Sequence, residues 1–517
     1  MSEHVRSDKK ELFGLAINPP VFIGSFLILA ATIVTTIAIG APVEELFEKA
    51  KNIISNATGW FFILLVNVLL FFLVFLLFSK FGKIRLGGKG AKPDFSRASW
   101  FAMLFSAGLG IGLLFYGVAE PIYHYNSNPF VDNADPIASA NSAMGITFLH
   151  YGIQAWSIYA VVALALAFFT FNLKLPLTIR SIFYPLLGNR IYGRIGDFID
   201  IISVLATVVG LSTSLGLGAQ QVNAGLEYLF GVPYSRVTQI IIIGVITVFA
   251  TLSLLSGLDK GIRRLSEVNV GLAMILLAFA LFLGPTAYLL DSFVQNIGYY
   301  IQNYFKLSFW TEANLGVSDE SRWQNNWTVF YYAWWIAWSP FVGIFIARVS
   351  RGRTIREFIF GVLLVPTIIT FLWFTVFGNG ALYFELLGDH SISVAVNENV
   401  STAIFKFLQK YPFVKVSSGL AILLVTSFFV TSSDSGSMVV DTLTSGGRHD
   451  APKFQKIFWA FMEGGTASVL LLYGGLSALQ SATIVTGLAF AVILVVILYS
   501  FYISMESYYD ENYDPED

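Results

Sequence analysis

Long apolar stretches separated by short polar segments make up most of the chain. Many stretches run for roughly 20 residues, which as an α-helix is enough to cross the ~30 Å hydrocarbon core of a bilayer. Hydropathy therefore predicts an all-α integral membrane protein with about twelve transmembrane helices, some of them tilted or broken. The predicted helices cover residues 19–40, 58–79, 98–122, 143–171, 197–229, 235–256, 267–290, 327–347, 356–378, 415–443, 455–474 and 478–504.

Basic residues are concentrated in every second loop. They follow the second, fourth, sixth, eighth and tenth predicted helices, in residues 80–97, 174–194, 260–264, 348–356 and 448–456. Loops rich in Lys and Arg stay on the cytoplasmic side, so both termini are predicted to be cytoplasmic. That places an N-terminal segment (1–18) and a short acidic tail (505–517) inside the cell, and the loop 291–326 outside. Residues 291–310 are either an amphipathic helix at the outer interface or an ordinary loop.

Composition supports a membrane protein and excludes several other classes. Apolar residues make up 56% of the 517 residues and charged ones only 12%, whereas about a quarter of a soluble chain is charged. The net charge of −2 gives no basic surface for nucleic acid, so a nucleic-acid partner is not expected. The chain has no Cys, which excludes disulfides and thiolate metal sites.

A Trp-rich segment lies in the predicted helix 327–347. Trp335 and Trp338 are three residues apart, and Trp334 and Trp338 are four apart, so at least two indoles share a helix face. Such a stripe is either an interfacial belt or one wall of a binding site. Trp338 lies near mid-span, where an indole N–H needs a polar partner, which favours the binding site. Several aromatic faces around one position attract a quaternary ammonium.

A second aromatic set lies in the predicted helix 143–171. Trp156 and Tyr159 are three residues apart and share a face, while Tyr151 lies to one side. These rings either complete the same cation site or pack between helices. His150 is either a hydrogen-bonded core histidine or an intramembrane proton carrier.

Glycines at 108, 110 and 112 weaken the predicted helix 98–122. The run follows no strand, so it is not a dinucleotide-binding turn. Exposed backbone inside a membrane must line a site or be packed, and close packing of helices through small residues is the alternative. Glu120, near the end of this helix, is either a surface carboxylate or a hydrogen-bonding group in an outer vestibule.

Two further helices carry polar runs that could hold a small cation. Hydroxyls and carbonyls are the ligands that sodium prefers, although hydroxyls in a helix also bond back to their own backbone. The runs are Thr431–Gly436 and a Thr/Ser/Gly-rich segment from Thr207 to Gly218. Asp434, Glu120 and His150 are too scattered along the chain to indicate an enzyme, and no channel filter motif is present.

The stretch Trp334-Trp335-Ile336-Ala337-Trp338-Ser339-Pro340-Phe341-Val342-Gly343, with the Arg-rich run from Arg348 to Arg356, resembles the betaine/choline/carnitine transporter family. The resemblance implies the inverted-repeat (LeuT-like) fold of sodium-coupled amino-acid transporters. Its five-helix repeats would be residues 98–290 and 327–504, with two peripheral helices in 19–97. It also implies a homotrimer in the cell membrane of a bacterium, with no cofactor beyond a coupling ion, Na⁺ or H⁺.

By the same resemblance, the trimethylammonium group of the substrate would be bound by Tyr151, Trp156, Tyr159 and Trp335. Trp334 and Trp338 would line the pathway, Phe115 would act as a gate, and the backbone of Gly110 and Gly112 would meet the other end of the substrate. Tyr151 stands where sodium-coupled glycine betaine carriers have Trp and bacterial choline carriers have Tyr. The expected function is therefore ion-coupled import of choline, with glycine betaine as the alternative.

The resemblance also implies two sodium sites. One would comprise Ser106, Leu109, Phe428, Thr431 and Ser432. The other would comprise Thr207 and Phe341, with Leu211 in place of a ligating Thr. Leu211 favours proton coupling, but Gly112 replaces the Asp of a proton-coupled choline carrier. Sodium and proton symport therefore both remain open.

Overall fold

In a computed structural model, the protein is described over residues 11–12, 15–108, 110–256, 261–314, 322–448 and 452–513. These residues are helical almost throughout, apart from a hairpin in which β1 (Glu11–Leu12) pairs antiparallel with β2 (Leu15–Ala16). The helices are α1 (Pro19–Ile39), α2 (Val43–Phe78), α3 (Arg97–Gly108), α4 (Ile111–Asn126), α5 (Pro136–Tyr151), α6 (Ile153–Phe171), α7 (Tyr184–Leu187), α8 (Arg194–Phe230), α9 (Arg236–Ser256), α10 (Gly261–Leu283), α11 (Thr286–Ser308), α12 (Phe330–Val349), α13 (Ile355–Phe374), α14 (Gly380–Leu386), α15 (Ser391–Glu398), α16 (Ala403–Leu408), α17 (Val414–Thr444) and α18 (Lys453–Tyr513). The predicted all-helical fold class is confirmed.

The number of candidate membrane-crossing helices is smaller than the predicted twelve. Among the described residues, nine helices are long and apolar enough to cross a membrane. The number is ten if α10 and α11, between which the chain bends by 111°, form one broken span. Part of the difference arises because two predicted spans, 455–474 and 478–504, both fall within α18, which is kinked at Gly475. The predicted span 98–122 is divided between α3 and α4, each shorter than a membrane-crossing helix. The division into two five-helix repeats stays a prediction.

The bend within α18 depends on Gly475. Its backbone has φ 56° and ψ −153°, a combination that is almost restricted to glycine. One turn earlier, the carbonyl oxygen of Leu472 accepts a hydrogen bond from Arg236 at 3.0 Å, and Arg236 also pairs with Glu44 at 3.0 Å. The side chain of Arg236 thus provides a partner for a carbonyl beside the break in the helix.

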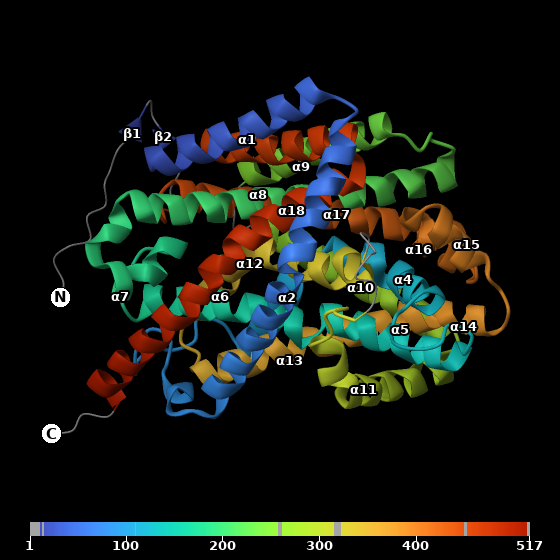
Figure 1. Cartoon of the computed structure of the whole chain (residues 1–517), viewed down its shortest axis with the longest axis horizontal. Helices are drawn as coiled ribbons and strands as arrows, with labels where there is room; N and C mark the ends of the chain where they lie inside the picture. Colours follow the sequence, from blue (N-terminus) through green and yellow to red (C-terminus); the bar gives the residue numbers. More distant parts are fainter. Residues whose placement is uncertain are drawn as a thin grey trace.

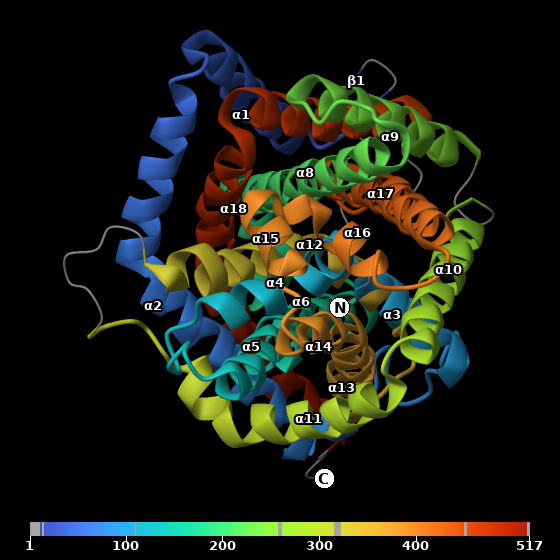
Figure 2. The same cartoon turned by 90° about the vertical axis from the view of Figure 1, so that its right-hand side faces the viewer.

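The helix α12 lies near the middle of the bundle in both views (Figures 1 and 2). Nearly all of its side chains are buried, whereas α1 on the outside exposes apolar side chains such as Leu27 and Val34. Because Pro340 has no N–H, it cannot bond the carbonyl of Ile336 one turn earlier. The hydroxyl of Ser339 donates to that carbonyl at 2.7 Å. A proline is therefore accommodated inside a buried helix without an unpaired carbonyl at this point.

The segment predicted as either an amphipathic helix or a loop is helical. It belongs to α11, which lies along the lower edge of the molecule in both views (Figures 1 and 2). Two buried polar contacts hold α11 against the bundle: Tyr300 Oη donates to Gln154 Oε1 at 2.6 Å, and Asn296 Nδ2 donates to Asn379 Oδ1 at 2.7 Å. Its position at an outer membrane interface stays a prediction.

We expect Gly475→Ala to destabilise the protein by about 1–3 kcal/mol, because the backbone conformation at 475 is strained for any residue with a Cβ. The added Cβ would also lie 2.9 Å from Glu44 Oε1. Gly465→Ala is the matched control, since it lies in the same helix and its Cβ would meet nothing within 4 Å. Thermal unfolding of the purified variants in detergent measures both effects. Equal melting temperatures for the two variants would contradict the assignment.

Candidate functional site

Two helix interruptions near the bundle centre shape the candidate site. The helix α3 ends at Gly108 and α4 begins after Gly110, so the predicted weakening by glycines is confirmed. A second interruption, which the sequence did not predict, separates α5 from α6 at Gly152. A Cβ at Gly152 would lie 2.3 Å from the carbonyl oxygen of Phe148 and 3.0 Å from the ring of Phe371. Only glycine fits between these groups.

The aromatic residues predicted to bind an ammonium group are brought together. The ring centroids of Tyr151 and Trp335 are 5.4 Å apart, those of Tyr159 and Trp335 are 6.4 Å apart, and those of Trp156 and Tyr159 are 5.7 Å apart. All three pairs are edge-to-face. Tyr151 ends α5, Trp156 and Tyr159 lie on α6, and Trp335 lies on α12. We call these four side chains the aromatic box.

A stack of indoles supports the aromatic box from behind. Trp334 lies parallel to Trp335, with ring centroids 4.8 Å apart and an interplanar angle of 13°. Trp338 contacts Trp334 edge-to-face at 6.5 Å. The indole nitrogens of Trp334 and Trp338 are buried and have no hydrogen-bond partner among the described residues. Phe115 is buried against Tyr116, with ring centroids 4.8 Å apart, and no ring contact joins it to the box within the described chain.

The start of α4 lies directly against the box. A Cβ on Gly112 would lie 3.2 Å from Tyr151 Cε1 and 3.3 Å from Trp335 Cη2. A Cβ on Gly110 would lie 3.3 Å from Trp338 Cη2. The two glycines therefore allow the backbone at this helix terminus to approach the rings closely.

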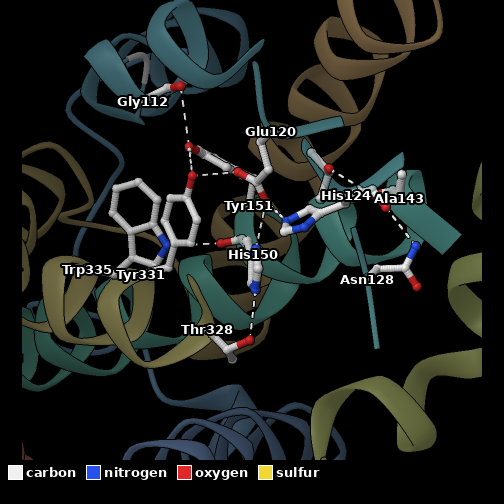
Figure 3. A network of polar contacts seen from close by, with 11 residues as sticks. Gly112, Glu120, His124, Asn128, Ala143, His150, Tyr151, Thr328, Tyr331 and Trp335 are labelled. Atoms are coloured by element: carbon white, nitrogen blue, oxygen red, sulfur yellow. Dashed lines mark hydrogen bonds and ion pairs between the residues drawn. The ribbon is translucent and has the colours of Figure 1, made fainter. Parts of the chain in front are cut away.

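A buried chain of hydrogen bonds holds two of the box rings (Figure 3). The hydroxyl of Tyr151 donates to Tyr331 Oη at 3.1 Å and lies 3.3 Å from the carbonyl oxygen of Gly112. Tyr331 Oη donates to Glu120 Oε2 at 2.5 Å, and Glu120 Oε1 lies 2.6 Å from His150 Nδ1. The indole N–H of Trp335 donates to the carbonyl oxygen of His150 at 2.9 Å. The network thus fixes one ring on α5 and one on α12.

The structure corrects two expectations about these polar groups. Glu120 is fully buried, so it is not a surface carboxylate. Glu120 and His150 are far apart in the sequence but are in direct contact in the structure. Asp434 lies elsewhere and accepts a hydrogen bond from Ser253 Oγ at 2.5 Å. His150 is a hydrogen-bonded core histidine, because its Nε2 also lies 3.0 Å from Thr328 Oγ1.

Three residues of this network were missed in the sequence: His124, Thr328 and Tyr331. The spacing of four between Glu120 and His124 was the available signal, because residues four apart share a helix face. His124 Nε2 lies 3.4 Å from Glu120 Oε1. Thr328 precedes α12 and Tyr331 lies in its first turn, far from Glu120 and His150 in the sequence, so only their side-chain contacts in the structure reveal their role.

The predicted sodium ligands are only partly described. Leu109 and the side chain of Ser106 lie outside the described residues. The hydroxyls of Thr207 and Thr431 donate to the carbonyls of Ser203 and Ser427, one turn earlier on their own helices. These bonds match the alternative, back-bonding interpretation of the polar runs. The remaining predicted ligands are Phe341, Phe428 and Ser432; Phe341 packs edge-to-face on Trp338 at 5.6 Å. Both sodium sites stay predictions.

The sequence of the chain, including the Trp-rich segment, matches a known protein family. Residues 20–510 match the family described as BCCT, the betaine/carnitine/choline family of transporters. The chain belongs to this family. It is therefore a multi-pass membrane transporter of the BCCT family and not an enzyme.

Several curated BCCT proteins are similar over nearly the whole chain. A glycine betaine transporter of Acinetobacter baylyi is 47% identical over 93% of this chain and 72% of its own length. The glycine betaine transporter OpuD of Bacillus subtilis is 46% identical over 92% of each chain. A glycine betaine/proline/choline transporter of Vibrio parahaemolyticus is 44% identical over 94% of this chain and 89% of its own. The expected special likeness to choline carriers is thus not supported, because these relatives are named for glycine betaine.

We expect Tyr331→Phe to lower the thermal stability of the protein in detergent. The change removes a hydrogen bond to a buried carboxylate, which is worth about 1.5–3 kcal/mol. Tyr332→Phe is the matched control, because the hydroxyl of its neighbour Tyr332 is buried and has no hydrogen-bond partner among the described residues. That variant should melt at or above the wild-type temperature. A Tyr331→Phe protein as stable as wild type would show that this bond contributes little.

Proposed function

We propose that the protein takes up glycine betaine by secondary active transport, with alternating access driven by an ion gradient. The observation that carries the proposal is the contact between the start of α4 and the aromatic box, at Gly112. Glycine betaine carries a trimethylammonium group and a carboxylate a few bonds apart. A site for it needs a surface for each charge side by side.

The aromatic box supplies the surface for the ammonium. A quaternary ammonium offers no hydrogen-bond donor and is attracted to the negative faces of aromatic rings. Tyr151, Trp156, Tyr159 and Trp335 form a connected set of rings from three helix segments. In the proposal they bind the trimethylammonium group, with Trp334 and Trp338 lining the pathway and Phe115 gating it.

The start of α4 supplies the surface for the carboxylate. The first N–H groups of a helix have no partner within the helix, and the helix dipole places partial positive charge there. These two effects make a helix N-terminus an anion-binding site. Gly110 precedes α4 and Gly112 lies in its first turn, and neither has a side chain to block the approach of a substrate. In the proposal, the backbone N–H groups here receive the substrate carboxylate.

Choline is the second candidate substrate. It has the same ammonium group but carries a hydroxyl in place of the carboxylate, so it uses the box and gains less from the α4 terminus. Tyr151 favours choline by resemblance, and the Vibrio parahaemolyticus relative is named for choline as well as glycine betaine. The names of three similar relatives favour glycine betaine as the main substrate.

We further propose a coupling ion and an oligomeric state for the transporter. An inward gradient of Na⁺ or H⁺ drives uptake, and the chain acts as a homotrimer in a bacterial cell membrane with both termini in the cytoplasm. Uptake in proteoliposomes with sodium replaced by potassium, with and without a protonophore, distinguishes the two ions. Loss of uptake on sodium removal alone identifies Na⁺, and loss with the protonophore alone identifies H⁺.

Purified protein in proteoliposomes should accumulate labelled glycine betaine against its concentration gradient. We expect a tenfold excess of unlabelled choline to reduce this uptake only in part, because choline lacks the carboxylate that the α4 terminus binds. Empty liposomes are the control. Transport of labelled choline with no transport of glycine betaine would overturn the substrate assignment.

Trp335→Ala should raise the KM for glycine betaine about 30-fold, since a desolvated cation–π contact contributes about 2 kcal/mol. Trp335→Phe should have a smaller effect, because it keeps an aromatic face. Trp60→Ala is the control, since Trp60 is an exposed indole on α2. Initial uptake rates over a range of substrate concentrations give KM for each variant. A wild-type KM in Trp335→Ala would refute the aromatic box.

A further inference from the structure

Beside the aromatic box lies a group of metal-ligating side chains that transport of an ammonium compound does not require. Glu120 and His124 come from α4 and His150 comes from α5 (Figure 3). One ligand atom from each of the three lies within 4.8 Å of the others, and all three residues are completely buried. Glu120 Oε1 is 2.6 Å from His150 Nδ1 and 3.4 Å from His124 Nε2.

Glu120 and His150, which contact each other, are each oriented by a hydrogen bond from the opposite side of the side chain. His150 Nε2 lies 3.0 Å from Thr328 Oγ1, and Glu120 Oε2 accepts from Tyr331 Oη at 2.5 Å. Metal-binding imidazoles and carboxylates are held in this way, with the atom that does not bind the metal hydrogen-bonded to a neighbouring group. The surroundings therefore resemble the outer shell of a metal site.

The imidazole of His124 is incompletely hydrogen-bonded. Nδ1 of its ring has no hydrogen-bond partner among the described residues, and Nε2 has only the 3.4 Å ion-pair contact with Glu120 Oε1, although the ring is completely buried. The rings of Trp323 and Trp327 pack against it, with centroids 5.1 Å and 4.5 Å away. A buried polar group without a partner is costly and rare. A metal ion bound to both Nε2 and Glu120 Oε1 would replace this long contact with direct ligation.

We propose that Glu120, His124 and His150 bind a divalent transition-metal ion of the zinc type. In a tetrahedral site with bonds near 2.0–2.1 Å, ligand atoms lie about 3.3 Å apart. The separation of 3.4 Å between Glu120 and His124 already fits, and the Glu120–His150 contact must open from 2.6 Å. The ion displaces the proton held between His150 Nδ1 and Glu120 Oε1, which leaves to solvent. Two imidazoles and one carboxylate select zinc-like ions over Mg²⁺ and Ca²⁺.

The position of the cluster gives the bound ion a consequence for transport, which rests on the proposed function. Tyr331 bonds both Glu120 and Tyr151, so two hydrogen bonds connect the Glu120 carboxylate to the aromatic box, and Trp335 also donates to the backbone carbonyl of His150. A divalent ion at Glu120 adds positive charge beside a site for a cationic group, in an interior that screens charges weakly. Zinc therefore inhibits uptake of the ammonium substrate.

Zinc binding to purified, tag-free protein tests the site directly. The metal-free protein is titrated with Zn²⁺ by calorimetry in detergent, and bound zinc per chain is measured after gel filtration. Wild type is expected to bind one zinc per chain, with no competition from excess Mg²⁺ or Ca²⁺. Absence of saturable zinc binding in wild type would overturn the proposal.

His124→Phe is the decisive variant, because it keeps a ring between Trp323 and Trp327 but removes both nitrogens. We expect it to bind zinc at least tenfold more weakly than wild type. His390→Phe is the matched control, since it removes an exposed imidazole that pairs with Glu385 outside the cluster. Equal zinc affinity in His124→Phe and wild type would overturn the assignment.

Two further measurements keep the test decisive if a variant fails to fold or to transport. X-ray absorption at the zinc edge of loaded wild-type protein should show two imidazoles among the nearest ligands, and a shell without imidazole would refute the site. In proteoliposomes, zinc should inhibit uptake by wild type and spare His124→Phe. A wild type that binds zinc but transports no ammonium substrate would contradict the proposed function and leave the metal site standing.

Discussion

The carboxylate of Glu120 is the group on which the centre of the molecule depends. A fully buried carboxylate is stable only when its oxygens are paired or hydrogen-bonded. Here one oxygen meets His150 and the other meets Tyr331, so a side chain from α4 ties together α5 and α12. These helices carry Tyr151 and Trp335. The requirement to satisfy one buried charge therefore also determines where two rings of the aromatic box lie.

Interrupted helices make this arrangement possible. Backbone inside a membrane can leave the helical conformation only where it is packed or lines a site. The start of α4 after Gly110 places a helix terminus beside the box, and the interruption at Gly152 allows Tyr151 and Trp156 to belong to different helices. Glycine is required at 152 because neighbouring groups occupy the space of a Cβ. The same few glycine positions thus interrupt the helices and shape the site.

Local patterns in the sequence predicted the all-helical fold class and the aromatic motifs, whereas the grouping of these rings into one box was implied by the family resemblance. Roughly 20-residue apolar runs and the spacing of Trp334, Trp335 and Trp338 are readable without knowing the packing. The interruption at Gly152 was not predicted, since it depends on Phe148 and Phe371 crowding that position. The meeting of Glu120 with His150 was missed for a similar reason: the two residues are 30 apart in the chain, and only the packing of α4 on α5 joins them. The substrate could not be read from Tyr151 alone.

The parallel stack of Trp334 on Trp335 has a consequence for the size of the ligand. Trp334 covers one face of Trp335, with ring centroids 4.8 Å apart. Trp335 therefore cannot move away from the other box residues unless Trp334 moves too. Trp338 and Phe330 hold Trp334 in turn, the latter by stacking at 5.5 Å. These stacked rings therefore form a rigid wall of the aromatic box. In the proposed function, a head group bulkier than trimethylammonium would have to displace several stacked rings, so the stack would set an upper limit on substrate size rather than add affinity.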